Sequence, residues 1–96
     1  MGDDDRFDWD DGNLWKTQER FEVECVEAIF DDEDRIPRPA YSVEGERRWG
    51  LIGATWDDRV LFVVYTWRGP KIRIISARRA EPREQGAYWA KRSRRR

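Results

Sequence analysis

The sequence contains no histidine and a single cysteine, Cys25. Without histidine, the commonest general base, the commonest zinc ligand and every Ser–His or Cys–His dyad are excluded. One cysteine excludes an intramolecular disulfide and a multi-cysteine zinc site. Because no basic residue adjoins Cys25 in the sequence, we interpret it as a packing residue rather than a nucleophile. Catalysis would have to use carboxylates, arginines, lysines, tyrosines or substrate groups, so we expect no metal or other cofactor.

Long apolar runs are also lacking. No stretch approaches the ~20 residues that a membrane-spanning helix needs. The first residues, "MGDDDR", are acidic where a secretory signal is basic. The 96 residues fit one domain, 1–96, with a modest core. We therefore expect a soluble, cytoplasmic protein without membrane contact, with mobile ends at residues 1–6 and 92–96.

The net charge of −1 hides a division of charge along the chain. Residues 1–34 carry 14 acidic and 3 basic side chains, whereas residues 35–96 carry 6 acidic and 16 basic ones. Sixteen of the 19 basic residues are arginines, and the planar guanidinium group binds phosphate or carboxylate with two parallel hydrogen bonds. A basic region with interleaved aromatics is typical of a surface for nucleic acid or for an acidic protein segment. The acidic front could also simply screen the basic back.

Apolar patterning predicts three strands in the second half of the chain. They are expected at residues 47–54, 59–67 and 71–77. The run "VLFVV", residues 60–64, is apolar at every position, which is typical of a central strand covered on both faces. The connections "TWDD" and "RGP" are short, so the strands should form an antiparallel meander. Pro37 and Pro39 lack a backbone donor, so residues 31–46 are expected at a sheet edge or off the sheet.

Helical spacing of apolar residues predicts two helices before these strands. The first follows a short edge strand at residues 6–9, is capped by Asp10 or Asp11 and runs to Phe21. The second covers "EVECVEAIFDD", residues 22–32. Glu81 followed by Pro82 is typical of a helix start, although Gly86 weakens that helix. The fold class is therefore α+β, with N-terminal helices packed on a three- to four-stranded antiparallel meander sheet and a C-terminal helix.

Three motifs carry a resemblance to a known family. They are "WDDGN" followed by Lys16, "EGERRW" at residues 44–49, and "IRIISARRA" at residues 72–80. In order, spacing and residue type over about residues 7–89, the chain resembles the BrnT toxins of BrnT–BrnA toxin–antitoxin modules. The resemblance implies a RelE-like fold and a metal-independent endoribonuclease that blocks translation. It also implies a cognate BrnA-like antitoxin that neutralises the toxin and contacts operator DNA, in a toxin–antitoxin heterotetramer.

The chain departs from this family where members commonly carry histidine. The "KHG" near the end of the first helix is replaced by "RFE", residues 20–22, and "AYSV", residues 40–43, lacks the histidine that often precedes "EGE". Two interpretations follow. Either the chain is a histidine-free ribonuclease, or it keeps the toxin fold without cleavage and acts in co-repression or inhibition by binding antitoxin or RNA.

Cleavage of RNA by its 2′-hydroxyl needs a group that takes the proton and charges that stabilise the phosphorane oxygens. We predict Arg48, Arg73 and Arg78 as phosphate clamps and Glu46 as general base. Arg78 matches the arginine of the family's "ISxR" motif and is expected to share a basic surface with Arg48. In a regular strand Arg73 and Arg78 point to opposite faces, so a bulge is needed to bring them together. The structural alternatives are a solvated Arg73 and an Arg48 that only pairs with Glu46.

Further basic and aromatic side chains are predicted to bind RNA. They are Lys16, Arg68, Arg79, Arg83 and Trp67. Tyr65 and Tyr88 could stack on a base or relay a proton. Trp9, Trp15 and Trp49 are interpreted as core residues rather than stacking platforms.

Overall fold

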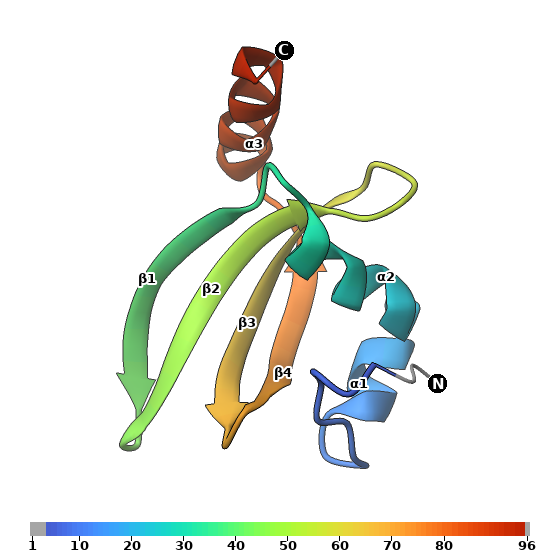
Figure 1. Ribbon diagram of the computed structural model, residues 1–96, viewed down its shortest axis with the longest axis vertical. Helices are drawn as coiled ribbons and strands as arrows, with labels where there is room; N and C mark the ends of the chain where they lie inside the picture. Colours follow the sequence, from blue (N-terminus) through green and yellow to red (C-terminus); the bar gives the residue numbers. More distant parts are fainter. Residues whose placement is uncertain (1–3, 96) are drawn as a thin grey trace.

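A computed structural model describes residues 4–95 as an α+β protein in which helices pack on an antiparallel sheet (Figure 1). The strands are β1 (Ile36–Val43), β2 (Glu46–Ala54), β3 (Val60–Arg68) and β4 (Lys71–Arg79), and they lie side by side in this order. The helices are α1 (Leu14–Gln18), α2 (Val23–Ala28), which continues into the short 3₁₀ turn η1 (Ile29–Asp31), and α3 (Pro82–Arg94). The predicted fold class is confirmed, with the sheet at the upper end of its expected size.

Strands β2, β3 and β4 fall where apolar patterning predicted them, whereas β1 lies in a segment that was expected at a sheet edge or off the sheet. All neighbours pair in antiparallel fashion, as the short connections require. The fourth strand is β1, which contains Pro37 and Pro39 and pairs only with β2. A bulge interrupts its register between Arg38 and Tyr41. An edge strand tolerates proline because one side of its backbone has no partner strand.

The N-terminal segment lies along the other edge of the sheet, beside β4. Phe7 forms an isolated parallel bridge with Ile72. The N–H of Asp8 donates to the carbonyl oxygen of Ile72 at 2.8 Å, and the N–H of Ile72 donates to that of Arg6 at 2.7 Å. This is the short edge strand expected at residues 6–9, reduced to one bridge. Residues 1–3 of the expected mobile N-terminus lie outside the described residues.

Helix α1 is shorter than predicted. It ends at Gln18, and the N–H groups of Arg20 and Phe21 both donate to the carbonyl oxygen of Thr17, at 3.0 and 2.8 Å. This turn directs Phe21 into the core. Trp15 is 53% exposed on the outer side of α1, so its interpretation as a core residue is wrong.

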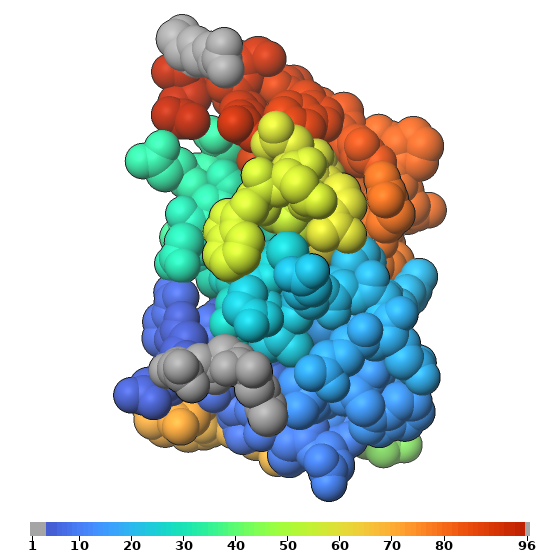
Figure 2. All heavy atoms as spheres, turned by 90° about the vertical axis from the view of Figure 1, so that its right-hand side faces the viewer, coloured from blue at the N-terminus to red at the C-terminus, as the bar shows by residue number. Residues whose placement is uncertain are grey.

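The main core lies between the sheet and the helices α1 and α2. Val26 and Ile29 are fully buried against Leu61 and Val63 of the central strand β3. Figure 2 shows this side of the molecule, with α1 in blue below α2 in cyan, and the β2–β3 loop in yellow and α3 in red above them. Gly53 permits the close approach, because a Cβ atom there would lie 2.9 Å from Cβ of Ile29.

Helix α3 stands at one end of the sheet and packs there on its other face (Figure 1). Its N-terminus has the capping box formed by Glu81 and Glu84, with proline in the first turn as predicted. The helix continues to Arg94, although we expected a mobile tail from residue 92. Distant contacts hold this last part, since Nζ of Lys91 donates to the carbonyl oxygen of Arg35 and Arg95 pairs with Asp34. Residue 96 lies outside the described residues.

Candidate functional site

Strand alternation divides the sheet into two faces. Leu51, Val63 and Ala77 lie opposite one another on three strands and belong to the core beneath α1 and α2. Their neighbours Phe62 and Arg78 therefore point to the other face, which α3 covers only at one end. The rest of that face carries basic side chains, and we call it the basic face. From the register, its members are Arg38, Arg48, Arg68, Lys71, Arg73 and Arg78.

A bulge in β4 places Arg73 and Arg78 on the same face. The β3–β4 register shifts by one residue, and Ile75 has no partner on β3. Arg73 lies opposite Thr66, and Arg78 lies opposite Phe62. Since Thr66 and Phe62 are four residues apart on a regular strand, they share a face. The bulge that a shared face requires is therefore present.

Glu46, Arg48 and Arg68 form a cluster at the end of the basic face away from α3. Nε of Arg48 donates to Oε1 of Glu46 at 3.0 Å, and Nη2 of Arg68 lies 3.9 Å from Oε2 of Glu46. The pairing of Arg48 with Glu46 matches the structural alternative considered from sequence. In this pairing, Arg48 uses only its Nε atom. Among residues 4–95, the two Nη atoms of Arg48 form no hydrogen bond. Those two nitrogens are the part of arginine that binds a phosphate in bidentate fashion.

Arg78 is bound to the start of α3. Its Nη1 and Nη2 donate to the two carboxylate oxygens of Glu84 at 2.8 and 3.0 Å, and its guanidinium group stacks 4.5 Å from the centre of the Phe62 ring. The hydrogen bond from Arg78 is the main reason why the pKa of Glu84 lies below its ordinary value. Both ends of the guanidinium fork are therefore occupied by this carboxylate.

Arg73 is neither free on the face nor solvated. It is 9% exposed, and its Nη atoms donate to both carboxylate oxygens of Asp10 at 3.0 and 2.9 Å. Asp8 lies 3.6 Å away, and these hydrogen bonds and charges raise the pKa of Arg73. The guanidinium group thus ties the N-terminal segment to the edge of β4, and the solvated alternative for Arg73 is wrong.

Arg48 and Arg78 share a face but do not converge. Their strands are separated by β3, which corresponds to about 10 Å, and their positions differ by four residues along the strands, or about 13 Å. Arg48 turns to Glu46 and Arg78 turns to Glu84, at opposite ends of the face. The two side chains therefore lie along one surface rather than around one phosphate.

The five side chains predicted to bind RNA lie on different surfaces. Arg68 belongs to the basic face. Trp67 is 47% exposed on the opposite face, beside Tyr65. Lys16 is exposed on α1, Arg79 at the end of β4, and Arg83 in the first turn of α3. These positions do not form one continuous site.

Neither tyrosine considered from sequence faces the basic surface. Tyr65 packs between Phe30 and Trp49 on the helix-covered face, and burial raises its pKa. Tyr88 is fully buried and donates its hydroxyl proton to Oδ2 of Asp32 at 2.5 Å. Burial, with this hydrogen bond, raises the pKa of Tyr88. Both hydroxyl groups are therefore protonated at neutral pH, and neither lies on the open part of the basic face.

Sequence reasoning missed Arg38. It lies opposite Gly50 on β1, exposed on the basic face, and its Cβ is 3.0 Å from where a Cβ of Gly50 would be. The only sequence signal is its position between Pro37 and Pro39, in the segment that the sequence places at a sheet edge or off the sheet.

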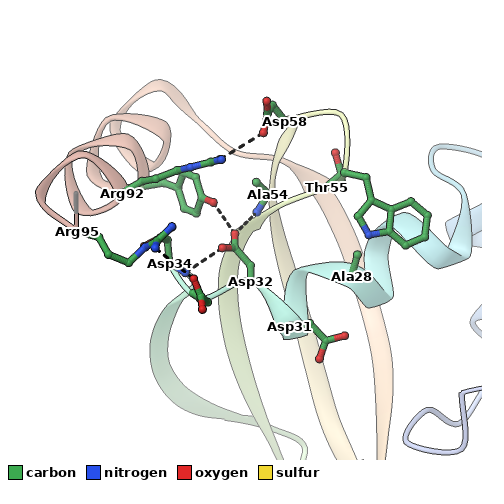
Figure 3. A pocket seen from close by; sticks show the side chains of 12 residues that line it. Ala28, Asp31, Asp32, Asp34, Ala54, Thr55, Asp58, Arg92 and Arg95 are labelled. Atoms are coloured by element: carbon green, nitrogen blue, oxygen red, sulfur yellow. Dashed lines mark hydrogen bonds and ion pairs between the residues drawn. The ribbon is translucent and has the colours of Figure 1, made fainter.

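A polar pocket beside α3 was also missed (Figure 3). Its volume is about 310 Å³. Asp32 accepts hydrogen bonds there from the Tyr88 hydroxyl and from the Ala54 N–H, while Arg92 pairs with Asp58 and Arg95 with Asp34. These contacts link residues 22 to 61 positions apart in the sequence, so no local motif reveals them. They hold α3 in place.

Metal ligands and membrane-spanning helices were also sought in the described part of the chain. Among residues 4–95, no three or more carboxylates and thiols are placed to hold a metal ion. Within the same residues, no helix is long and apolar enough to cross a membrane.

A sheet with α1 and α2 on one face, and with α3 and a row of basic side chains on the other, defines a small α+β protein. A family described as the ribonuclease toxin BrnT of type II toxin–antitoxin systems matches residues 9–84, and the chain belongs to this family. The resemblance drawn from the motifs is thereby confirmed. A toxin of this type implies an antitoxin partner. A search of curated proteins gave no match.

Proposed function

We propose that this chain is a metal-independent endoribonuclease of the cytoplasm that blocks translation and is neutralised by a cognate BrnA-like antitoxin. The observation that carries the proposal is the cluster of Glu46, Arg48 and Arg68 on the open part of the basic face. There a carboxylate and an unoccupied guanidinium fork lie side by side. Membership in a ribonuclease toxin family supports the reaction class.

In the proposed reaction, Glu46 takes the proton of a ribose 2′-hydroxyl, and the 2′-oxygen attacks the adjacent phosphorus. Arg48 and Arg68 bind the non-bridging oxygens and stabilise their growing charge. The bond from phosphorus to the 5′-oxygen breaks, and this oxygen takes a proton from water, because guanidinium is too weak an acid to supply it. The products are a 2′,3′-cyclic phosphate and a 5′-hydroxyl end.

The other predicted residues take supporting roles in this proposal. Arg73 and Arg78 contribute positive potential along the basic face while Asp10 and Glu84 hold their guanidinium groups. Arg38 extends the charged surface toward β1. Lys16, Arg79, Arg83 and Trp67 would contact RNA only away from the cleaved bond.

The second candidate is a toxin-fold protein without catalysis that binds antitoxin or RNA and acts in co-repression. Two observations favour it. The chain has no histidine to act as general acid, and two of its three predicted clamps are occupied by carboxylates. Under either function, we propose a toxin–antitoxin heterotetramer that contacts operator DNA only through the antitoxin.

The test is cleavage of a 5′-labelled RNA by purified protein in the presence of EDTA. The variants are Arg48→Ala, Glu46→Gln and the control Arg47→Ala, whose side chain is on the same strand but points to the opposite face. We expect cyclic-phosphate products from the wild type and from the control. Loss of one preorganised donor should slow cleavage by Arg48→Ala about 100-fold. If Arg48→Ala cleaves as fast as the control, the site is wrong. If the wild type leaves RNA intact, the second candidate replaces the first.

A further inference from the structure

The two edges of the sheet differ in how well they are protected from other strands. At the β1 edge, Pro37, Pro39 and a bulge make a poor template for strand pairing. At the β4 edge, the N-terminal segment covers Ile72 with two main-chain hydrogen bonds. The side-chain amide of Asn13 covers the carbonyl oxygen of Ile74. Within residues 4–95, no such hydrogen bonds cover the part of β4 beyond its bulge.

The register identifies which backbone groups of β4 point outward. The carbonyl oxygen of Val60 accepts from the N–H of Ala80, so the backbone groups of Val60 and, by alternation, of Phe62 face β4. The residue opposite Phe62 is Arg78, whose backbone groups therefore face β3. Ala77 precedes Arg78 in the strand. By alternation, its backbone N–H and carbonyl groups therefore point away from β3 and out of the sheet.

These outward groups lack partners. Among residues 4–95, no hydrogen bond is formed outward by the N–H or carbonyl oxygen of Ala77 or by the N–H of Arg79. The carbonyl oxygen of Arg79 accepts from its neighbour Arg78 at 3.1 Å. A row of alternating donors and acceptors on an extended strand fits the main chain of another extended peptide.

A groove between α1 and β4 begins beside the bulge and reaches this stretch at Ala77. Its volume is about 280 Å³. Ile75 and Ala77 line it from β4, Lys16 lines it from α1, and Arg20 lines it from the turn that follows α1. Glu19 is the acidic residue that lines it. The groove therefore combines a small apolar floor, a free strand edge and a mainly basic rim.

We propose that an extended, acidic segment of a protein partner adds to the β4 edge at Ala77–Arg79 as a fifth strand, with its carboxylates toward Lys16 and Arg20. The identity of the partner, an antitoxin, rests on the proposed function. The geometry of the site does not depend on that function. A peptide fits better than RNA, since the exposed groups alternate as in a β-ladder.

The probes are three capped hexapeptides: Ac-EVTVEV-NH₂, Ac-KVTVKV-NH₂, and the acidic peptide N-methylated at alternate residues. Binding to the whole chain is followed by fluorescence anisotropy, and amide hydrogen exchange is followed by NMR. We expect the acidic peptide to bind more tightly than the basic one, and to slow exchange at Ala77 and Arg79. N-methylation should abolish binding, because it removes the main-chain donors. Equal binding of all three peptides, no binding, or no protection at Ala77 overturns the proposal.

Variants test the charge and the backbone separately. The double variant Lys16→Glu, Arg20→Glu should weaken binding of the acidic peptide about tenfold, because two exposed ion pairs are lost. The control Arg47→Glu with Arg94→Glu changes the same charge at exposed positions outside the groove and should have no effect. Ala77→Pro removes one outward N–H and should weaken binding about fivefold. If the control variant weakens binding as much as the groove variant, the attraction is non-specific and the site is wrong.

Two further results separate this proposal from the proposed function. Arg48→Ala should bind the acidic peptide like the wild type, whatever happens to RNA cleavage. An RNA oligonucleotide that protects Ala77 and Arg79 better than the acidic peptide would overturn the peptide assignment and leave the cleavage site on the basic face untouched.

Discussion

The ion pair between Arg78 and Glu84 should link the stability of this protein to pH. The Glu84 side chain is 14% exposed, accepts both Nη atoms of Arg78, and also accepts the N–H of Glu81 at 2.7 Å. Glu84→Gln keeps the shape and the acceptor for Glu81 but removes the charge. We expect the free energy of unfolding of the variant to be about 1–2 kcal/mol lower than that of the wild type at pH 7. The loss is no larger because Arg78 is partly exposed and solvent screens the pair.

The sign of the pH dependence follows from the depressed pKa of Glu84. Arg78 holds this pKa below its ordinary value of 4.5, so the carboxylate is easier to ionise in the folded than in the unfolded chain. The stabilisation is therefore fully present above the unfolded pKa and is lost as the pH falls through the folded pKa. The difference between wild type and variant should be constant near neutrality and should disappear in strong acid.

Urea unfolding at pH 7 and at about pH 2.5 measures this difference. Glu19→Gln is the control, because Glu19 is exposed and forms no ion pair within residues 4–95. Glu84→Gln should differ from the control at neutral pH and match it in acid. A Glu84→Gln variant as stable as Glu19→Gln at pH 7, or equally weakened at both pH values, would refute the reasoning.

Two further predictions concern the packing that positions the site. Tyr88→Phe should lower the free energy of unfolding by about 1.5–3 kcal/mol, because it removes a hydrogen bond to the charged Asp32 while the buried ring stays; thermal unfolding would show this, and an unchanged Tm would contradict it. Gly53→Ala should lower the free energy of unfolding by about 1–3 kcal/mol, because the added methyl group overpacks against Ile29. Gly86→Ala should raise it by up to about 1 kcal/mol, because Gly86 has open space around it in α3 and alanine favours a helix. A Gly53→Ala variant at least as stable as the wild type would contradict the close approach between Gly53 and Ile29.

Much of the fold was predictable because its signals are local. The apolar runs of β2, β3 and β4 and their short connections fix an antiparallel meander without reference to anything distant. Glu81, Pro82 and Glu84 likewise mark the start of α3 within four residues. The length of α3 was not predictable, because its last turn depends on partners such as Asp34, 61 residues away.

The candidate site was predictable in residue type but not in arrangement. Motifs singled out Glu46, Arg48 and Arg78, and alternation alone showed that a bulge would decide whether Arg73 joins them. The bulge at Ile75 has no sequence signature of its own here, since it arises from how β4 pairs with β3. Which guanidinium groups remain open depends on which carboxylates reach them across the fold.

The sequence by itself therefore determined the α+β class, the meander of β2, β3 and β4, the division of charge and the family, because propensity, periodicity and composition are properties of neighbouring residues. Only the tertiary structure decided that basic side chains of all four strands share a face, that Asp10 and Glu84 occupy two of them, and that part of the β4 edge stays unpaired among residues 4–95. Those outcomes depend on strand register and on contacts between distant residues, and a shift of one residue reverses the face of every side chain in a strand.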